Sequence, residues 1–234
     1  CADNLLLDIK LIIRSLIFNI LFFLISSIMA LFLFPFLISR RSTLIIAYCW
    51  AKIVLFLLKN VCGVLIKISD QNQINKNGVI FAVRHESMLD TILFLAYNLD
   101  IKYIVKKELL YVPFYGLFVW RSGHIIINRK GKSKTLLKMV NKVREYANSG
   151  KNIIIFPHGT RIGVGQNIRV QSGIFAFYKY LDKPIIPIHI STGHVWKKNG
   201  FIKQPGIVEV KFLEKINKGL NKSEFLSIIN NRLN

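Results

Sequence analysis

The pattern of apolar and polar positions begins with one long uncharged segment. Residues 15–39 contain no charged side chain and are dominated by Leu, Ile and Phe. At ~1.5 Å per residue, a helix of this length reaches roughly 37 Å, which exceeds the ~30 Å core of a bilayer. We therefore expect this segment to attach the chain to a membrane, either by crossing the bilayer or by dipping into one leaflet.

Basic residues flank this segment on both sides. Lys10 and Arg14 precede it, and Arg40 and Arg41 follow it, with further lysines beyond. An excess of positive charge on the C-terminal side favours the cytosol for that side. Residues 43–59 predict a second helix, which has a lysine in its middle. We expect this helix to be too short to span the bilayer and to lie along the membrane surface or pack on the main domain.

After this point the pattern changes to short apolar runs that alternate with helical patterns. The clearest helical pattern is residues 132–149, whose apolar side chains fall on one face and which Gly150 would end. Alternation of this kind predicts an α/β domain with a mixed, largely parallel sheet flanked by helices. We expect residues 1–60 to form N-terminal membrane-anchoring helices and residues 61–234 to form the α/β domain. The expected strands are 64–68, 79–83, 101–105, 124–127, 153–156, 185–190 and 207–212, and the expected helices are 88–99, 132–149, 172–181 and 223–233.

Composition and charge narrow the class of partner. The 234 residues are 52% hydrophobic, and their mean hydropathy of +0.40 is high for an ordinary soluble domain. Yet 33 Lys and Arg against 12 Asp and Glu give a net charge of +21, which suits an anionic membrane, an acidic substrate or an acidic carrier protein. The charges are dispersed, so we do not expect nucleic acid as a partner. The three cysteines lack metal-ligand spacing, and no metal site is expected.

The turn after the second expected strand carries the candidate catalytic residues. Residues 79–83 predict a buried strand, and Ser87 and Asp90 stand in the relation of an N-cap and the third residue of the following helix. A strand-to-helix turn can bring His85 and Asp90 together. A carboxylate on one imidazole nitrogen leaves the other nitrogen free to act as a general base. The alternative is a histidine satisfied in a loop and an acid that only caps the helix.

Three further loops place a Lys or Arg beside Gly or Pro near the end of an expected strand. They are residues 105–116, 123–129 and 156–161. Guanidinium groups match phosphate geometry, and glycine lets backbone amides approach an anion. Ligands of α/β sheets bind outside the carboxyl ends of the strands. A surface ion pair would explain any one of these arginines, but together the three loops predict an anion site beside the His85–Asp90 pair.

Five short segments occur together in a fixed order. They are His85-x4-Asp90, Lys106-x-Glu108-Leu109 with Pro113-Phe114-x-Gly116, Gly123 to Ile127-x-Arg129, Gly159-Thr160-Arg161, and Pro184-Ile185-Ile186-Pro187. This set resembles the motifs of the glycerolipid acyltransferase family, most of all the bacterial 1-acyl-sn-glycerol-3-phosphate (lysophosphatidic acid) acyltransferases. The resemblance runs from about residue 64 to the C-terminus, and the N-terminal apolar segment resembles the family's membrane anchor in placement only.

The resemblance implies an activity in phospholipid biosynthesis. A fatty acyl group would pass from a thioester, on acyl carrier protein or coenzyme A, to the 2-hydroxyl of lysophosphatidic acid, giving phosphatidic acid. His85 would be the general base and Asp90 would orient it, with no cofactor beyond the thioester co-substrate. The implied place is the bacterial inner membrane, with the catalytic domain facing the cytosol. The residues implied to hold the acceptor's phosphate are Lys106, Arg129, Gly159, Thr160 and Arg161.

Some positions depart from the family pattern. His158 stands where the family has Glu, and Arg84 stands where it often has Asn. A histidine weakens any role that needs a carboxylate, but it can add a hydrogen-bond donor to a phosphate, so His158 is a candidate supporting residue together with Gly123. Two alternatives stay open. One is a catalytically silent lipid-binding homologue, and the other is an acyltransferase that acts on another lysolipid.

Overall fold

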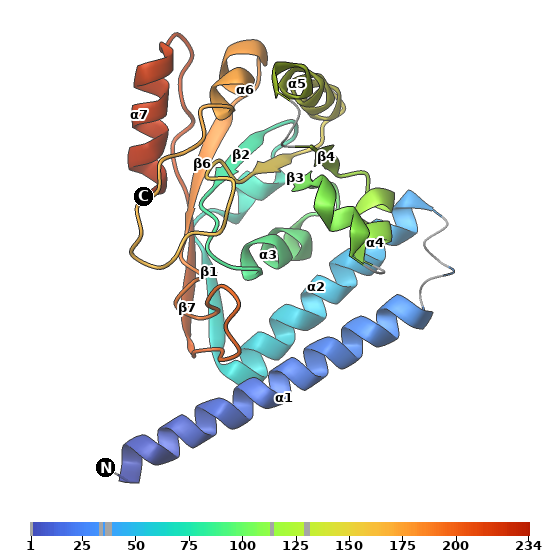
Figure 1. The fold of residues 1–234 in the computed structure, drawn as a ribbon, viewed down its shortest axis with the longest axis vertical. Helices are drawn as coiled ribbons and strands as arrows, with labels where there is room; N and C mark the ends of the chain where they lie inside the picture. Colours follow the sequence, from blue (N-terminus) through green and yellow to red (C-terminus); the bar gives the residue numbers. More distant parts are fainter. Residues whose placement is uncertain (1, 33–34, 36–38, 113–114, 129–131) are drawn as a thin grey trace.

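The computed structural model describes residues 2–32, 35, 39–112, 115–128 and 132–234 (Figure 1). Its helices are α1 (Ala2–Phe32), α2 (Arg40–Cys62), α3 (Leu89–Tyr97), α4 (Tyr115–Arg121), α5 (Lys132–Asn148), α6 (Ile174–Tyr180) and α7 (Lys222–Leu233), with the short 3-10 helices η2 (Gln71–Asn75) and η3 (Lys107–Tyr111). Its strands are β1 (Val64–Ile68), β2 (Ile80–Val83), β3 (Lys102–Lys106), β4 (Ile125–Ile127), β5 (Ile153–Ile155), β6 (Ile185–Ile190) and β7 (Gly206–Phe212).

The strands form one mixed sheet in the order β1-β7-β6-β2-β5-β3-β4. Every neighbouring pair is parallel except β6 with β7. The central strands β2 and β5 consist of continuous apolar residues buried on both faces, as is typical of parallel sheets covered by helices. The prediction of a mixed, largely parallel sheet flanked by helices is therefore confirmed.

Helices cover both faces of the sheet, so successive strand residues pack into two different cores. On one face, Phe81 and Ile154 pack with side chains of α2 and α3. On the other face, Ile80 and Ile153 pack with side chains of α5, α6 and α7. Strand side chains point alternately to opposite faces, and these apolar strands therefore supply both cores at once. Loops that carry the candidate chemistry follow the carboxyl ends of β2, β3, β5 and β6.

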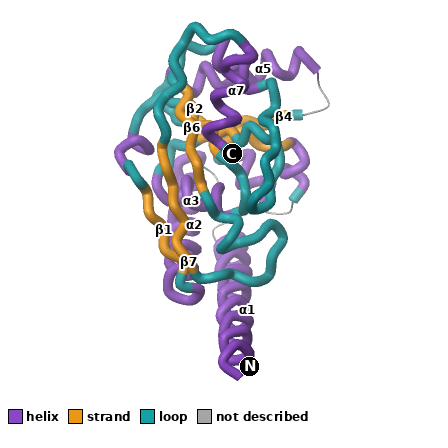
Figure 2. Tube along the Cα trace, turned by 90° about the vertical axis from the view of Figure 1, so that its left-hand side faces the viewer, coloured by secondary structure: helices purple, strands orange, loops and turns teal. Residues whose placement is uncertain are grey.

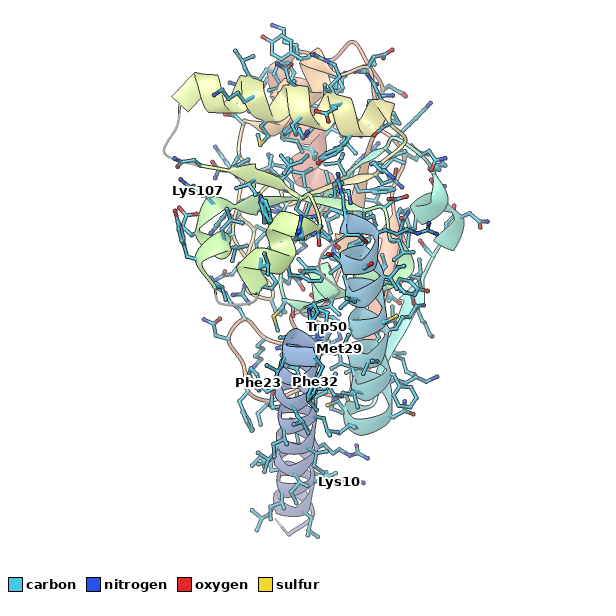
Figure 3. The ribbon with its side chains drawn as sticks, turned by 90° about the vertical axis from the view of Figure 1, so that its right-hand side faces the viewer. Lys10, Phe23, Met29, Phe32, Trp50 and Lys107 are labelled. Carbon is cyan, nitrogen blue, oxygen red and sulfur yellow. The ribbon has the colours of Figure 1, made fainter. Side chains whose placement is uncertain are left out.

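Helices α1 and α2 lie side by side and run in opposite directions (Figure 1). The α1 helix continues without a break to Phe32, and its N-terminal part projects beyond the rest of the chain (Figure 2). Large apolar side chains on its outer face are exposed, among them Phe23 (65%) and Phe32 (67%), which Figure 3 labels. Trp50 of α2 donates from Nε1 to the hydroxyl oxygen of Ser26 in α1 at 3.0 Å. The outer face of α1 therefore remains apolar and uncovered within the described chain.

The second helix is longer than expected. It begins at Arg40, with Ser39 as the N-cap, and ends at Cys62, with Gly63 as a left-handed C-cap. With 23 residues it is long and apolar enough to cross a membrane, as is Leu5–Phe32. The expectation that it is too short to span was therefore wrong, because its last turn continues to Cys62. Its inner face packs on α3 and β1, in agreement with the expectation that it packs on the main domain.

A segment between β6 and β7, residues 191–203, connects the α/β domain to α1. Trp196 and Lys203 form an antiparallel bridge, and the Trp196 ring meets those of Phe18 and Phe22 of α1 edge-on. Lys203 is 1% exposed; its Nζ donates to Oδ1 of Asn19 at 3.1 Å and its backbone amide donates to the Ser15 hydroxyl at 2.9 Å. Burial lowers the pKa of Lys203 to about 8. This segment therefore fixes α1 against the domain.

Candidate active site

The predicted pair of His85 and Asp90 is present in the turn between β2 and α3. Nδ1 of His85 lies 2.8 Å from Oδ2 of Asp90. The pair forms because β2 ends at Val83 and α3 begins at Leu89, so the chain folds back over the first turn of the helix. An ionised carboxylate only accepts hydrogen bonds, so Nδ1 carries the proton and Nε2 is the free nitrogen. The pairing expected from the sequence is confirmed.

Asp90 accepts more hydrogen bonds than the sequence predicted. Its Oδ2 also accepts from the backbone amides of Glu86 at 2.7 Å and Ser87 at 2.9 Å. The Ser87 hydroxyl accepts from the Leu89 amide at 3.2 Å. The prediction of Ser87 as the N-cap was wrong, because α3 begins one residue later and Met88 occupies the N-cap position; of the expected reciprocal cap, the bond from the Ser87 amide back to Asp90 is present. Asp90 is fully buried, and these donors satisfy a charge that would otherwise be costly to bury.

Two residues of this site were not predicted from the sequence. The hydroxyl of Thr192 donates to the second carboxylate oxygen of Asp90, Oδ1. Glu86 accepts at Oε2 from the backbone amides of Thr192 at 3.0 Å and Gly193 at 2.9 Å. Both contacts join positions more than 100 residues apart, so no local spacing could reveal them. They bring the end of β6 against the turn that carries His85.

Arg84 pairs with Glu86 in the interior of the domain. Its Nε lies 2.8 Å from Oε1 of Glu86, and its other nitrogens donate to the backbone carbonyls of Leu233 at 2.9 Å and Gln166 at 3.0 Å. Arg84 is 4% exposed and Glu86 is 5% exposed. The arginine that replaces the family's Asn is therefore part of the support under the turn.

The third motif lies directly beside His85. The backbone amide of Ile162 donates to the carbonyl of His85 at 2.7 Å, and the Phe156 ring stacks on the imidazole with 4.0 Å between centroids. Gly159 adopts a left-handed backbone conformation with φ of 74°, which suits glycine. Thr160 next to it is exposed. The structure thus brings the first and third motifs together, as expected.

Arg161 is only partly buried and faces the segment after β6. Its Nη2 donates to Oδ1 of Asn199 at 3.4 Å, and Lys198 Nζ donates to the Arg161 carbonyl at 3.5 Å. Lys106 is exposed at the end of β3 and is in register with Ile127 of β4. Arg129 lies outside the described residues. Within the described chain, no hydrogen bond joins Arg161 or Lys106 to His85 or Asp90, so their convergence on one phosphate stays a prediction.

Gly123 lies against the start of α2. Its backbone is left-handed, with φ of 65°, and its carbonyl accepts from the guanidinium of Arg40 at 3.4 Å. A side chain at this position would collide with the same guanidinium. These contacts give Gly123 a packing role between α4 and α2, and a role in supporting substrate stays a prediction.

His158 is 2% exposed and lies next to the catalytic turn. Among the described residues, neither of its ring nitrogens makes a hydrogen bond of good geometry. Burial, with the nearby charges of Arg84 and His85, lowers the pKa of His158 to about 4, while the Ile168 backbone, which lies near the ring, acts to raise it. The imidazole is therefore neutral at pH 7, in the position where the family has a carboxylate. A positive charge on His158 is not available to hold a phosphate.

Comparison with known proteins identifies the family of the chain. Residues 65–191, more than half of the chain, match the family model described as Acyltransferase. The chain belongs to the acyltransferase family.

Individual relatives of this acyltransferase have named activities. It is 28% identical over 182 residues to the 1-acyl-sn-glycerol-3-phosphate acyltransferase of Pseudomonas aeruginosa, covering 78% of this chain and 71% of that protein. It is 28% identical over 158 residues to the enzyme of that name from Limnanthes alba, covering 66% of this chain and 56% of the plant protein. It shares its fold with the solved PlsC acyltransferase of Thermotoga maritima, with a TM-score of 0.72, 20% identity and 94% of each chain covered.

In an acyltransferase, this arrangement suits proton transfer more than covalent catalysis. The free nitrogen of His85 belongs to a ring held on one side by Asp90 and on one face by Phe156. Among the described residues, the hydroxyl of Thr192 donates to Asp90 and that of Ser87 accepts from the Leu89 amide, and both side chains are fully buried. A hydroxyl brought by the substrate is therefore the natural proton donor to His85.

Proposed function

We propose that this acyltransferase moves a fatty acyl group from a thioester to the 2-hydroxyl of lysophosphatidic acid, forming phosphatidic acid. The observation that carries the proposal is the His85–Asp90 pair, joined at 2.8 Å within a chain of the acyltransferase family. The choice of acceptor is supported by the names of the relatives from Pseudomonas aeruginosa and Limnanthes alba.

His85 acts as the general base in this proposal. Its Nε2 takes the proton of the acceptor hydroxyl as that oxygen attacks the thioester carbonyl, while Asp90 holds the resulting imidazolium. The tetrahedral intermediate then collapses and expels the thiolate, which receives the proton from Nε2. The new ester bond and the free thiol are the products, and His85 returns to its starting state. This is the Ser-His-Asp scheme with the substrate hydroxyl in place of serine, so no acyl-enzyme forms.

The acceptor's phosphate is held by the basic loops at the same edge of the sheet. Arg161 and Lys106 supply positive charge from the ends of β5 and β3, and Arg129 follows β4 in the chain. Gly159 and Thr160 add close donors in the turn beside His85. The backbone amide of Ile162 donates a hydrogen bond to the carbonyl of His85. This bond holds the third motif beside His85 and so supports the assignment.

The donor and the location follow from charge and exposed surface. A net charge of +21 suits an acyl thioester on an acidic carrier protein or on coenzyme A. The uncovered apolar face of α1 attaches the enzyme to the inner membrane of a bacterium, with the α/β domain in the cytosol. No cofactor and no metal take part in the proposed reaction.

An acceptor and donor panel tests the proposal. The full chain in detergent or vesicles is assayed with lysophosphatidic acid and with a monoacylglycerol that lacks the phosphate, using acyl-coenzyme A and acyl carrier protein thioesters. We expect phosphatidic acid from the wild type with at least one donor, and a fall of about 10²- to 10⁴-fold in His85→Ala. Equal rates in wild type and His85→Ala would overturn the general-base role. Equal rates with and without the phosphate would assign a different acceptor.

A further inference from the structure

We propose that Thr192 is a positioning residue for catalysis, which completes a hydrogen-bonded chain from Thr192 through Asp90 to His85. The inference rests on the proposed role of His85 and adds a residue outside the recognised motifs. Asp90 uses Oδ2 for His85 and for two backbone amides. Its Oδ1 receives the hydroxyl of Thr192. The carboxylate plane is therefore fixed from both oxygens.

Thr192 is itself held from both sides. Its amide donates to Oε2 of Glu86, and its carbonyl accepts from the amides of Val195 at 3.2 Å and Trp196 at 2.9 Å. The neighbouring amide of Gly193 donates to the same Glu86 oxygen. A Cβ at Gly193 would lie within 3.2 Å of that oxygen and 2.8 Å of the Val164 side chain. The backbone is thus built closely around Glu86, and the hydroxyl has a fixed direction.

The contact has a defined effect on the acid–base pair. A hydroxyl that donates to a carboxylate stabilises its charged form and makes it a weaker base. Without this donor, Oδ1 is buried and unpaired, and Asp90 binds the imidazolium more tightly. Removing the hydroxyl should therefore move the protonation of His85 to higher pH, and it leaves the Asp90 carboxylate held through Oδ2 alone. The charged and titratable groups around the pair are Arg84, Glu86, Tyr103 and His158, and none of them is changed by substituting Thr192.

The variant Thr192→Val tests the hydrogen-bonded chain from Thr192 to His85, because it removes the hydroxyl. The variant Thr192→Ser keeps a hydroxyl at this position. The matched control is Thr43→Val in α2, where an equally buried hydroxyl donates to the Ser39 carbonyl at 2.9 Å. We expect kcat to fall about 10- to 100-fold in Thr192→Val, since a hydrogen bond to a charged group is lost, with little change in KM for the acceptor. The acid limb of kcat/KM should move to higher pH. Thr192→Ser should keep most of the rate.

A second readout does not depend on activity. The imidazole of His85 is titrated by NMR in the detergent-solubilised full chain, where its titration midpoint should rise in Thr192→Val and stay at the wild-type value in Thr43→Val. The same kcat and midpoint in both valine variants would overturn the proposal. If Thr192→Val does not fold, Thr192→Ser is compared with Thr192→Ala. Equal kcat and equal titration midpoints of His85 in these two variants would also overturn the proposal. An inactive wild type would instead count against the proposed function, and the titration would still test the chain.

Discussion

The turn around His85 and the helix α1 depart from the usual distribution of side chains in opposite directions. In the turn, the ionisable residues Arg84, Glu86 and Asp90 are buried, and each has hydrogen-bonding partners. In α1, large apolar side chains such as Phe23 and Phe32 are exposed. The first region needs partners inside the protein, whereas the second needs an apolar surrounding outside it. Both departures mark function, because neither is favourable for a domain that only has to be stable in water.

The largest expected effect comes from neutralising the buried acid. Asp90→Asn keeps the shape of the side chain but removes the charge that stabilises the imidazolium, so we expect kcat to fall about 10²- to 10⁴-fold. The amide also places a donor group among the donors of Glu86, Ser87 and Thr192, which should lower the thermal unfolding temperature. Steady-state kinetics and calorimetry measure both effects. An active Asp90→Asn enzyme would show that the buried charge serves stability alone.

A second test uses pH. Burial and neighbouring charges lower the pKa of His158 to about 4, and burial beside Lys102 and Arg40 lowers that of His124 to about 3, both from an ordinary value of 6.5. The unfolded chain therefore binds more protons between these values, so stability is present above pH ~6.5 and is lost as pH falls toward 3. We expect the free energy of unfolding to fall by about 2 kcal/mol for each of these two histidines when the pH is lowered from 7 to 5. Urea unfolding at both pH values measures this loss.

The control for that experiment is His158→Gln, which removes one of the two titrating rings. On lowering the pH, this variant should lose less free energy of unfolding than the wild type. The difference should be about the contribution of one histidine. A slope identical to that of the wild type would show that His158 is not buried as a neutral imidazole.

A smaller effect is expected at the edge of the site. Arg161→Ala removes a charge from the turn beside His85, so KM for lysophosphatidic acid should rise about 10- to 100-fold with a smaller change in kcat. Arg144→Ala is the matched control, because Arg144 lies on α5 and bonds Asn141 and the Tyr180 carbonyl. An acceptor KM that changes equally in both variants would remove Arg161 from the phosphate site.

The smallest effect on stability is expected from the exposed face of α1. The triple variant Ile20→Ser, Leu24→Ser, Leu31→Ser alters side chains that are 51–66% exposed, so the free energy of unfolding in detergent should change by no more than about 0.5 kcal/mol per site. Binding to lipid vesicles, measured by flotation, should fall sharply because apolar contact area is lost. Phe18→Ala on the buried face of α1 is the contrast, with an expected cost of about 3–5 kcal/mol. Unchanged flotation of the triple variant would argue against membrane attachment through this face.

Most of the sheet could be predicted from the sequence because its strands are short apolar runs separated by polar turns. The expected strands 64–68 and 185–190 coincide with β1 and β6, and the others agree within one or two residues. Helix α4 was not expected, since Tyr115–Arg121 is a single short segment without a long apolar period. Helices were expected within residues 1–60, but the apolar segment predicted only 15–39, because charged residues interrupt the apolar pattern before it; α1 begins earlier, at Ala2.

The site was predictable only as far as its contacts are local. His85 and Asp90 are five residues apart, so a capping pattern could reveal them. Glu86 lies in the same turn, but Thr192 reaches it from the segment after β6, more than 100 residues away, and only the folded chain brings the two together. The basic loops could be located from their composition. Whether their side chains point toward one phosphate depends on side-chain direction, which the spacing of residues along the sequence does not specify.

The segment 191–203 fixes the position of the His85 turn relative to α1. Thr192 at one end is bonded to Asp90, and Lys203 at the other end is bonded to Ser15 and Asn19 of α1. The ten residues between them, 193–202, fix His85 relative to α1, and with α1 in the membrane as proposed they would set the height of His85 above the acyl chains. A lysolipid whose tail stays in that layer would then present its hydroxyl at one depth only, and the enzyme would choose among hydroxyls by their distance from the tail.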